Sequence, residues 1–265
     1  MQKKRRMSVW RKKMRVAKDA KLQVKLLLLA TLVTAVLWFL PYTEWLVYPL
    51  RLFVTFVHES SHAIVGALTG SSVKSLVVFP NGEGVVLLTS YNWFSSFLTS
   101  SAGYLGTAIC GAILLAMMRR NFPAKNSLIL LAAFIGLATL LFGFIVPLFN
   151  VFDEAITFKQ IAFTFLAGSI LTAVLVFLAL RCNPRIQNFA VAFLAVQLVL
   201  NSLFDLKTLF MINAPLIGSN IHTDATNMEQ LTNIPAIIWV LIWIALSVLI
   251  ISIALRLYAV SQKDS

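Results

Sequence analysis

The sequence predicts an all-α polytopic membrane protein, with about seven transmembrane helices and a small β-hairpin inserted after the second. Its composition is the first observation: 59% of the 265 residues are hydrophobic and 12% are charged, whereas a soluble domain averages about 45–50% apolar and about 25% charged residues. The second is a series of apolar stretches near the roughly 20 residues that a helix needs to cross the hydrocarbon core. The third observation is a segment between two of these stretches, which is rich in β-branched residues and is interrupted by a turn signal. A water-soluble domain is excluded, because so few charges cannot cover its surface.

The net charge of +12 is concentrated at the start of the chain, where residues 1–25 hold 11 of the 22 basic residues and a single acid, Asp19. A basic run directly before an apolar segment retains an N-terminus in the cytoplasm and can contact anionic lipid headgroups. We predict a basic cytoplasmic segment over 1–25, a membrane domain over 26–258 and a polar tail over 259–265, in a bacterial-type plasma membrane. Nucleic-acid binding is not expected, because Trp10 is the one aromatic residue of the basic run.

The first apolar stretch, 26–42, ends in aromatic residues and proline rather than the small residues of a cleavage site, so we predict a retained span and not a signal peptide. Six further stretches lie at 46–69, 93–118, 128–149, 160–180, 186–210 and 234–258. Seven spans would put the two termini on opposite sides and would place Arg119, Arg120 and Lys125 outside, against the charge rule. Either one stretch does not cross fully, or the N-terminal cluster overrides the weaker signals.

Residues 72–90 break this pattern, because two β-branched runs flank Pro80-Asn81-Gly82 and Asn-Gly is a strong hairpin turn signal. Lipid does not tolerate open strand edges, so we expect this hairpin to lie against the bundle or in a cavity. Its free edge either accepts an extended substrate as an added strand or belongs to an ordinary surface hairpin.

The stretch 46–69 contains the motif His58-Glu59-Ser60-Ser61-His62. Residues four apart share one face of a helix, so His58 and His62 can present two imidazoles to one metal ion. In an HExxH motif the histidines are zinc ligands, and the glutamate is the general base for the water that zinc activates. A charge at mid-bilayer costs about 2.5–3.5 kcal/mol, and a divalent metal would compensate for it. The alternatives are a polar helix face without metal, and a metal site without catalysis.

A catalytic zinc usually has three protein ligands and an open position. Elimination of acids in tails, at an interface and in the hairpin turn leaves as third-ligand candidates Asp153, Glu154, Asp205, His222, Asp224 and Glu229. Asp205 is preferred, because it lies in an otherwise apolar span and Asn201, one turn before it, could orient its carboxylate. An ion pair with Lys207 is the alternative for Asp205. Asp224 is the second choice of ligand, and His222 the third.

At this point the chain resembles the site-2 protease family of intramembrane zinc metallopeptidases, specifically its short bacterial-type members. The resemblance covers roughly residues 45–240. It rests on the HExxH motif, Gly66 and Gly70, the hairpin, the run Ser101-Ala102-Gly103-Tyr104-Leu105-Gly106 and an aspartate in a later helix.

The resemblance implies cleavage of membrane-protein substrates in or near their transmembrane segments. It also implies zinc as cofactor, His58, His62 and Asp205 as its ligands, and Glu59 as the base. The chain departs from the family's Asn-Pro and Leu-Asp-Gly pattern, because Asn201-Ser202-Leu203-Phe204-Asp205-Leu206 lacks both the proline and the glycine.

Two further interpretations concern the same residues. The glycines at 66, 70, 103 and 106 allow a neighbouring helix to approach closely, and close packing is the role that we predict for them ahead of substrate contact. A non-catalytic metal-binding scaffold, or a transporter whose ion path includes His58, His62 and Asp205, is the alternative to a protease. The glutamate within the HExxH spacing favours the protease.

Overall fold

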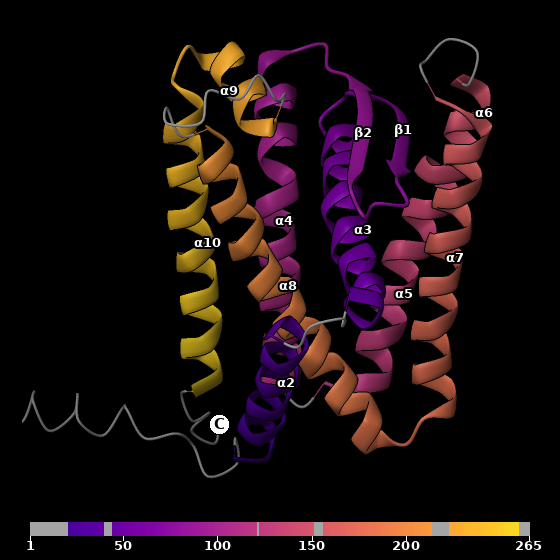
Figure 1. Ribbon diagram of the computed structural model, residues 1–265, viewed down its shortest axis with the longest axis vertical. Helices are drawn as coiled ribbons and strands as arrows, with labels where there is room; N and C mark the ends of the chain where they lie inside the picture. The colour runs from indigo at the N-terminus through magenta and orange to yellow at the C-terminus, as the bar shows by residue number, and fades with distance from the viewer. Residues whose placement is uncertain (1–20, 40–43, 121, 151–155, 214–222, 260–265) are drawn as a thin grey trace, which may run out of the picture.

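A computed structural model describes residues 21–39, 44–120, 122–150, 156–213 and 223–259. Most of the predicted basic segment, nearly all of the C-terminal tail, and Asp153, Glu154 and His222 lie outside these residues. The described chain is a bundle of helices with one two-stranded antiparallel sheet beside it (Figure 1).

Five helical segments of the described chain are long and apolar enough to cross a membrane. They are α4 (Trp93–Arg119), the continuous run of α5 (Ala124–Leu140), η2 (Leu141–Ile145) and α6 (Val146–Asn150), α7 (Phe158–Arg181), α8 (Pro184–Asn213) and α10 (Ala236–Ala259). Each begins and ends within a few residues of a predicted apolar stretch. The prediction of seven spans is not confirmed.

The two remaining predicted spans are α2 (Lys21–Phe39) and α3 (Glu44–Leu68), which run in the same direction one after the other (Figure 1). The first residue of α2 lies at the lower end of the bundle in Figure 1, and α3 ends at the upper end, where the hairpin begins. With polar residues such as Arg51 and those of the HExxH motif, α3 is not among the helices found apolar enough to cross. A hydrogen bond of 2.7 Å from Gln197 Nε2 to Thr34 Oγ1 joins α2 to the middle of α8.

The predicted hairpin is confirmed as β1 (Ser72–Val78) and β2 (Gly84–Thr89). Gly82 has a left-handed φ of 86°, and its N–H donates to the carbonyl of Phe79 at 2.9 Å, as in a three-residue hairpin loop. β1 packs against α3, α6, η2 and α7. Its Val78 N–H donates to Thr164 Oγ1 of α7 at 2.9 Å. β1 is therefore the covered strand, and β2 is the outer one.

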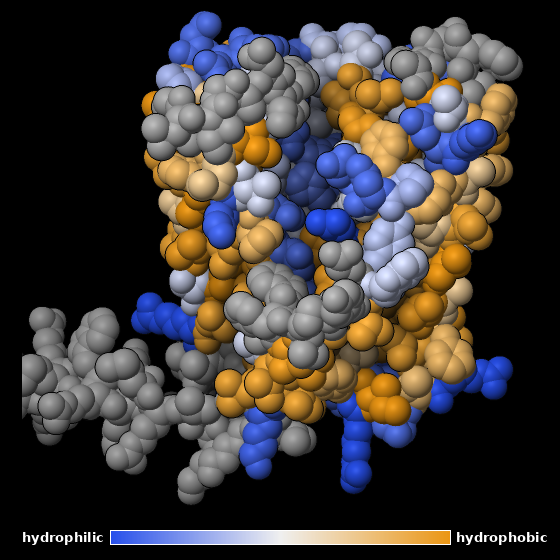
Figure 2. Space-filling model, viewed as in Figure 1, coloured by the Kyte–Doolittle hydropathy of each residue, from blue (hydrophilic) through white to orange (hydrophobic). Residues whose placement is uncertain are grey.

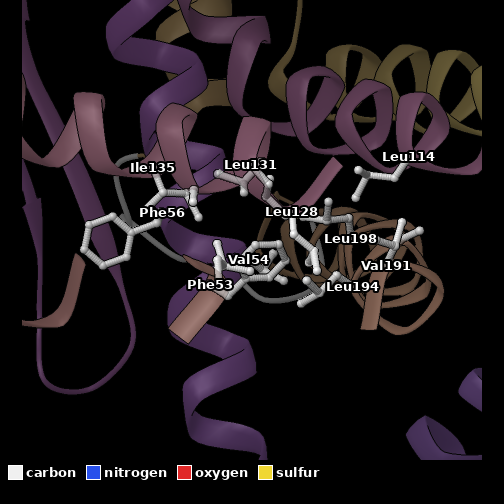
Figure 3. Close-up of a cluster of buried hydrophobic side chains, with 14 of the residues drawn as sticks. Phe53, Val54, Phe56, Leu114, Leu128, Leu131, Ile135, Val191, Leu194 and Leu198 are labelled. Carbon is white, nitrogen blue, oxygen red and sulfur yellow. The ribbon is translucent and has the colours of Figure 1, made fainter. Parts of the chain in front are cut away.

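A cluster of buried side chains packs α3 against α5 and α8 (Figure 3). Phe53 and Phe56 of α3 meet Leu128 and Ile135 of α5 and Leu198 of α8 within this cluster. Helix association in lipid depends on such close packing, because lipid tails are as apolar as the side chains themselves. The cluster fixes the rotation of α3 in the turn directly before His58, and so determines which way the motif faces.

Candidate metal centre

His58 and His62 lie one turn apart on α3, and their Nε2 atoms are 3.1 Å apart. His62 Nδ1 lies 2.7 Å from the backbone carbonyl of Thr99 on α4. A carbonyl only accepts hydrogen bonds, so this contact places the ring proton on Nδ1 and leaves the Nε2 lone pair available to a metal. The same face of α3 therefore presents two imidazole nitrogens, as the HExxH spacing predicts.

Asp224 supplies a third potential ligand, with Oδ2 3.3 Å from His62 Nε2 and 3.7 Å from His58 Nε2. His58, His62 and Asp224 are the one group of three or more histidine, cysteine or acidic ligands that the described residues bring within metal-binding reach of one another. Burial opposes the ionisation of Asp224, but His62 and His58 outweigh it and lower the pKa of this carboxyl below its usual range. Asp224 is therefore a carboxylate at neutral pH.

Asp224 is the first residue of α9 (Asp224–Thr232). Thr223 caps this helix: its Oγ1 accepts from Thr226 N–H at 3.2 Å, and Thr226 Oγ1 accepts from Thr223 N–H at 2.8 Å. Ala225 and Met228 are fully buried, and α9 packs on α4 and α10. The cap and this packing together hold the Asp224 carboxylate over α3.

Asp205, the preferred third ligand from the sequence, does not belong to this group. It lies on α8 and lines the same cavity, near enough to His58 and Arg51 for electrostatic interaction. Asn201 does not orient it as expected, because Asn201 Nδ2 donates to Gln197 instead. Within the described chain, no ion pair joins Asp205 to Lys207 either. The geometry thus favours the second choice, Asp224, over Asp205.

The helical glycines do pack closely, and two of them pack against the motif itself. A Cβ at Gly103 would contact Nε2 of both His58 and His62, and a Cβ at Gly106 would contact Ser61. A Cβ at Gly66 would lie 3.3 Å from Leu88 Cδ2, so the space there is tight. For Gly70 the packing prediction is wrong: its φ is 89° and no atom lies within 4 Å of the Cβ position, so it serves the turn after α3.

Glu59 is buried, with 7% of its surface exposed. Residue 84, the first of β2, lies directly over it: a Cβ on Gly84 would be 2.6 Å from Glu59 Cγ and 2.8 Å from its Oε1. The sequence does not indicate this role of Gly84, because the contact joins two separate elements. The hairpin therefore covers the carboxylate beside the two histidines.

A cavity of about 1710 Å³ contains His58, His62, Glu59, Asp224 and Asp205 in its lining. It lies between α3 and the hairpin on one side and α4, α8 and α9 on the other, and Figure 2 shows it as a hydrophilic hollow with apolar surface on either side. Four residues of β2 also line it: Gly84, Val85, Val86 and Leu88. The site is thus open to polar molecules although helices of the bundle surround it.

Tyr104 forms part of the wall behind His58. The two rings are perpendicular, with centroids 4.7 Å apart, and Tyr104 stacks on Trp243 of α10 at 5.4 Å. Trp243 Nε1 in turn donates to Ser101 Oγ at 3.1 Å. This packing restricts the movement of the His58 ring.

The three ligand atoms fit a zinc ion. Zinc binds histidine nitrogen and carboxylate oxygen at about 2.0–2.2 Å in tetrahedral geometry, which separates the ligand atoms by about 3.3–3.6 Å. The three separations here are 3.1, 3.3 and 3.7 Å. The absence of a side chain at Gly103 provides the space beside the two nitrogens. Two histidines and one carboxylate are also a ligand set of catalytic zinc sites.

Five apolar helices, and a polar cavity lined by two of them with this cluster in its wall, define an integral membrane protein with a candidate metallopeptidase centre. The chain matches the family model described as Peptidase M50B-like over residues 29–254. It therefore belongs to this family, and the resemblance to site-2 proteases is confirmed. Comparisons with curated proteins and with solved structures gave no match.

Proposed function

We propose that this protein is a zinc-dependent intramembrane endopeptidase that hydrolyses peptide bonds in or near the transmembrane segments of membrane proteins. The observation that carries the proposal is the triangle of His58 Nε2, His62 Nε2 and Asp224 Oδ2, with separations of 3.1, 3.3 and 3.7 Å, beside the buried Glu59. Membership of a peptidase family whose M50 members are generally zinc-dependent supports it.

In this proposal His58, His62 and Asp224 hold the zinc. Bound zinc supplies Lewis acidity, which polarises a carbonyl and makes water a stronger nucleophile at neutral pH. Glu59 takes a proton from the attacking water and passes it to the nitrogen of the leaving amine. The Thr99 carbonyl keeps the His62 ring in the tautomer that leaves Nε2 free. The Asp224 carboxylate offsets one positive charge where the apolar bundle offers little solvation.

The substrate would lie along β2. In the described chain β2 pairs with β1 alone, and four of its residues line the cavity. An extended segment can add to such an edge through main-chain hydrogen bonds. A transmembrane helix must unwind before its peptide bonds can be attacked, and the edge offers hydrogen-bond partners that lipid lacks. This favours a substrate-binding edge over an ordinary surface hairpin.

The proposal is tested on purified protein by measuring zinc content together with cleavage of a transmembrane peptide. Glu59→Gln should retain stoichiometric zinc and lose cleavage. Asp224→Ala should lose zinc, and Asp205→Ala, an acid in the same cavity, is the matched control that should retain it. Loss of zinc in Asp205→Ala but not in Asp224→Ala would overturn the ligand assignment.

The same measurements separate the alternative functions. Stoichiometric zinc without any Glu59-dependent hydrolysis would identify a metal-binding scaffold or regulator. Proton or zinc flux into vesicles that persists in Glu59→Gln would identify a transporter.

A further inference from the structure

Three side chains of α3 hold the loop of the hairpin, which lies alongside this helix (Figure 1). One face of α3 carries Tyr48, Arg51 and Thr55, the loop-binding residues, because residues three and four apart are neighbours on a helix surface. Each donates a hydrogen bond to a backbone carbonyl, and the three acceptors are consecutive in the loop. The bonds run from Tyr48 Oη to Pro80 O at 2.9 Å, from Arg51 Nη1 to Asn81 O at 3.4 Å and from Thr55 Oγ1 to Gly82 O at 2.7 Å.

The loop satisfies its remaining backbone groups internally. Gly82 N–H donates to Phe79 O at 2.9 Å, and Phe79 N–H donates to Glu83 O at 2.8 Å. The Asn81 side chain also bonds to Glu83, because Asn81 Oδ1 accepts from Glu83 N–H at 3.0 Å and Asn81 Nδ2 donates to Glu83 Oε2 at 2.7 Å. With the three bonds from α3, each carbonyl from 79 to 83 accepts a hydrogen bond. The shape of the loop and its attachment to α3 are therefore satisfied together.

Gly82 allows the loop to lie directly on α3. It is buried, and a Cβ at this position would be 2.5 Å from Arg51 Cδ and 3.1 Å from Arg51 Cγ. The aliphatic part of Arg51 thus packs against the loop backbone, while its guanidinium group reaches the next carbonyl. Such packing of a long charged side chain contributes in addition to its hydrogen bond.

Thr55 connects the loop to the part of α3 that carries the metal centre. It lies one turn before Glu59 on the same face of the helix. A Cβ on Gly84 would be 2.8 Å from Thr55 Cγ2 and 2.6 Å from Glu59 Cγ. Gly84, the first residue of β2, therefore rests on both side chains. A shift of the loop along α3 would move the start of β2 relative to Glu59.

The other end of this part of the hairpin is attached to a different helix. The hydrogen bond from Val78 N–H to Thr164 Oγ1 joins β1 to α7, which does not carry Glu59. Hydrogen bonds depend strongly on distance and angle. Three of them to consecutive carbonyls therefore specify one position of the loop on α3, which apolar packing alone would specify less sharply.

We propose that Tyr48, Arg51 and Thr55 are positioning residues for peptide-bond hydrolysis. They fix β2 relative to Glu59, and so determine which peptide bond of a segment bound along β2 reaches the metal centre. This inference rests on the proposed function and on substrate binding along β2. Thr55 contributes most, because its hydrogen bond is the shortest, it is partly buried and it also contacts the position of Gly84. The hydrogen bond of Arg51 is the longest and its side chain is exposed, so its contribution is mainly the packing of its aliphatic part.

The test removes single hydroxyl groups and measures zinc content, kinetics and cleavage position on the same purified proteins with a transmembrane peptide. Thr55→Val keeps the branched shape of the side chain but loses the donor, and Thr55→Ser keeps the donor. Tyr48→Phe removes one oxygen atom from a partly exposed side chain, and serves as the second variant if Thr55→Val does not fold. Thr172→Val on α7 is the matched control, because its hydroxyl donates to Gly168 of its own helix.

Thr55→Val should retain stoichiometric zinc and lower kcat by about 10- to 10²-fold, since displacement by about 1 Å has an effect of about 10²-fold. KM should change less than kcat, because β2 keeps its main-chain groups. Mass spectrometry of the products should show shifted or additional cleavage positions. Tyr48→Phe should show the same changes to a smaller extent, and Thr55→Ser and Thr172→Val should match the wild-type protein.

A role in folding alone would lower zinc content and turnover together and leave the cleavage position unchanged. That result would overturn the proposal, as would unaltered kcat and cleavage position in zinc-bound Thr55→Val.

Hydrogen exchange of the zinc-loaded protein tests the attachment of the loop without any cleavage. Amide exchange within 79–84 should be about 2- to 13-fold faster in Thr55→Val, the effect of losing one net hydrogen bond, and unchanged in Thr172→Val. Equal exchange in Thr55→Val and the wild-type protein would overturn the proposal. Absence of cleavage by the wild-type protein would instead count against the proposed function, so the two failures remain distinguishable.

Discussion

Replacing Gly103 with alanine would test how closely α4 encloses the proposed metal centre. The added methyl group would contact Nε2 of both His58 and His62, closer than real Cβ contacts occur. The two rings are held by Thr99 and by the wall at Tyr104, so relief requires movement of a ring or of the α4 backbone. Zinc sites hold their ligand distances within about 0.2 Å, and overpacking a tight interior costs about 1–3 kcal/mol. If this free energy is lost from zinc binding, zinc affinity falls about 5- to 150-fold.

Zinc affinity would be measured on detergent-purified protein by competition with a chromophoric chelator, and circular dichroism would verify the helical content. Gly111→Ala is the matched control on the same helix. Its Cβ would also be crowded, at 2.9 Å from Val199 Cγ2, but this neighbour is a methyl group and not a proposed metal ligand. Both changes raise helix propensity by about 1 kcal/mol. The control should bind zinc as tightly as wild type. A folded Gly103→Ala protein with undiminished zinc affinity would refute the placement of the ion between these two nitrogens.

Three further outcomes are expected. Gly84→Ala places a methyl group 2.6 Å from Glu59 Cγ. It should lower kcat by about 10²-fold, the effect of displacing a catalytic group by about 1 Å, while zinc is retained. Unchanged turnover would contradict the role of Glu59. Thr164→Val leaves the buried Val78 N–H without its acceptor and should destabilise the protein by about 1–3 kcal/mol in denaturant unfolding. Thr164→Ser should not, and equal stability of both variants would contradict this reasoning. Zinc removal should lower the Tm of the wild-type protein. At a zinc concentration of 100 Kd, bound zinc stabilises the folded state by about 2.7 kcal/mol. An equal loss of stability in Asp224→Ala would argue against Asp224 as a ligand.

Local patterns in the sequence accounted for the five spanning segments and the hairpin, but not for α9. Length and apolarity marked the five spanning segments, because a helix that crosses lipid satisfies its own backbone and needs no partner to be recognised. Asn81-Gly82 between two β-branched runs marked the hairpin, since its turn chemistry is also local. Local patterns did not determine how many times the chain crosses the membrane. Whether α2 and α3 each cross or ascend in succession depends on how α2 packs on α8, for example through Gln197 and Thr34.

The preference for Asp205 over Asp224 arose from a sound premise, that a carboxylate within an apolar span has a function. This premise did not select the Asp224 carboxylate, which lies beside the histidines, because the position of a carboxylate within the cavity depends on helix packing. One local signal marked the start of the helix that carries Asp224: Thr223 directly before it is a favoured N-cap residue, and it does cap α9.

The sequence by itself determined that two imidazoles and a glutamate share one helical turn, because the periodicity of a helix is local. Tertiary structure decided what completes this group. Asp224 follows His58 by 166 residues, and its carboxylate reaches the histidines because α9 packs on α4 and α10. Gly103 and Gly84 acquire their roles only when α4 and the hairpin close over α3. Ligand atoms about 3 Å apart are positioned by contacts between distant segments, and such contacts leave little trace in the sequence near any one of them.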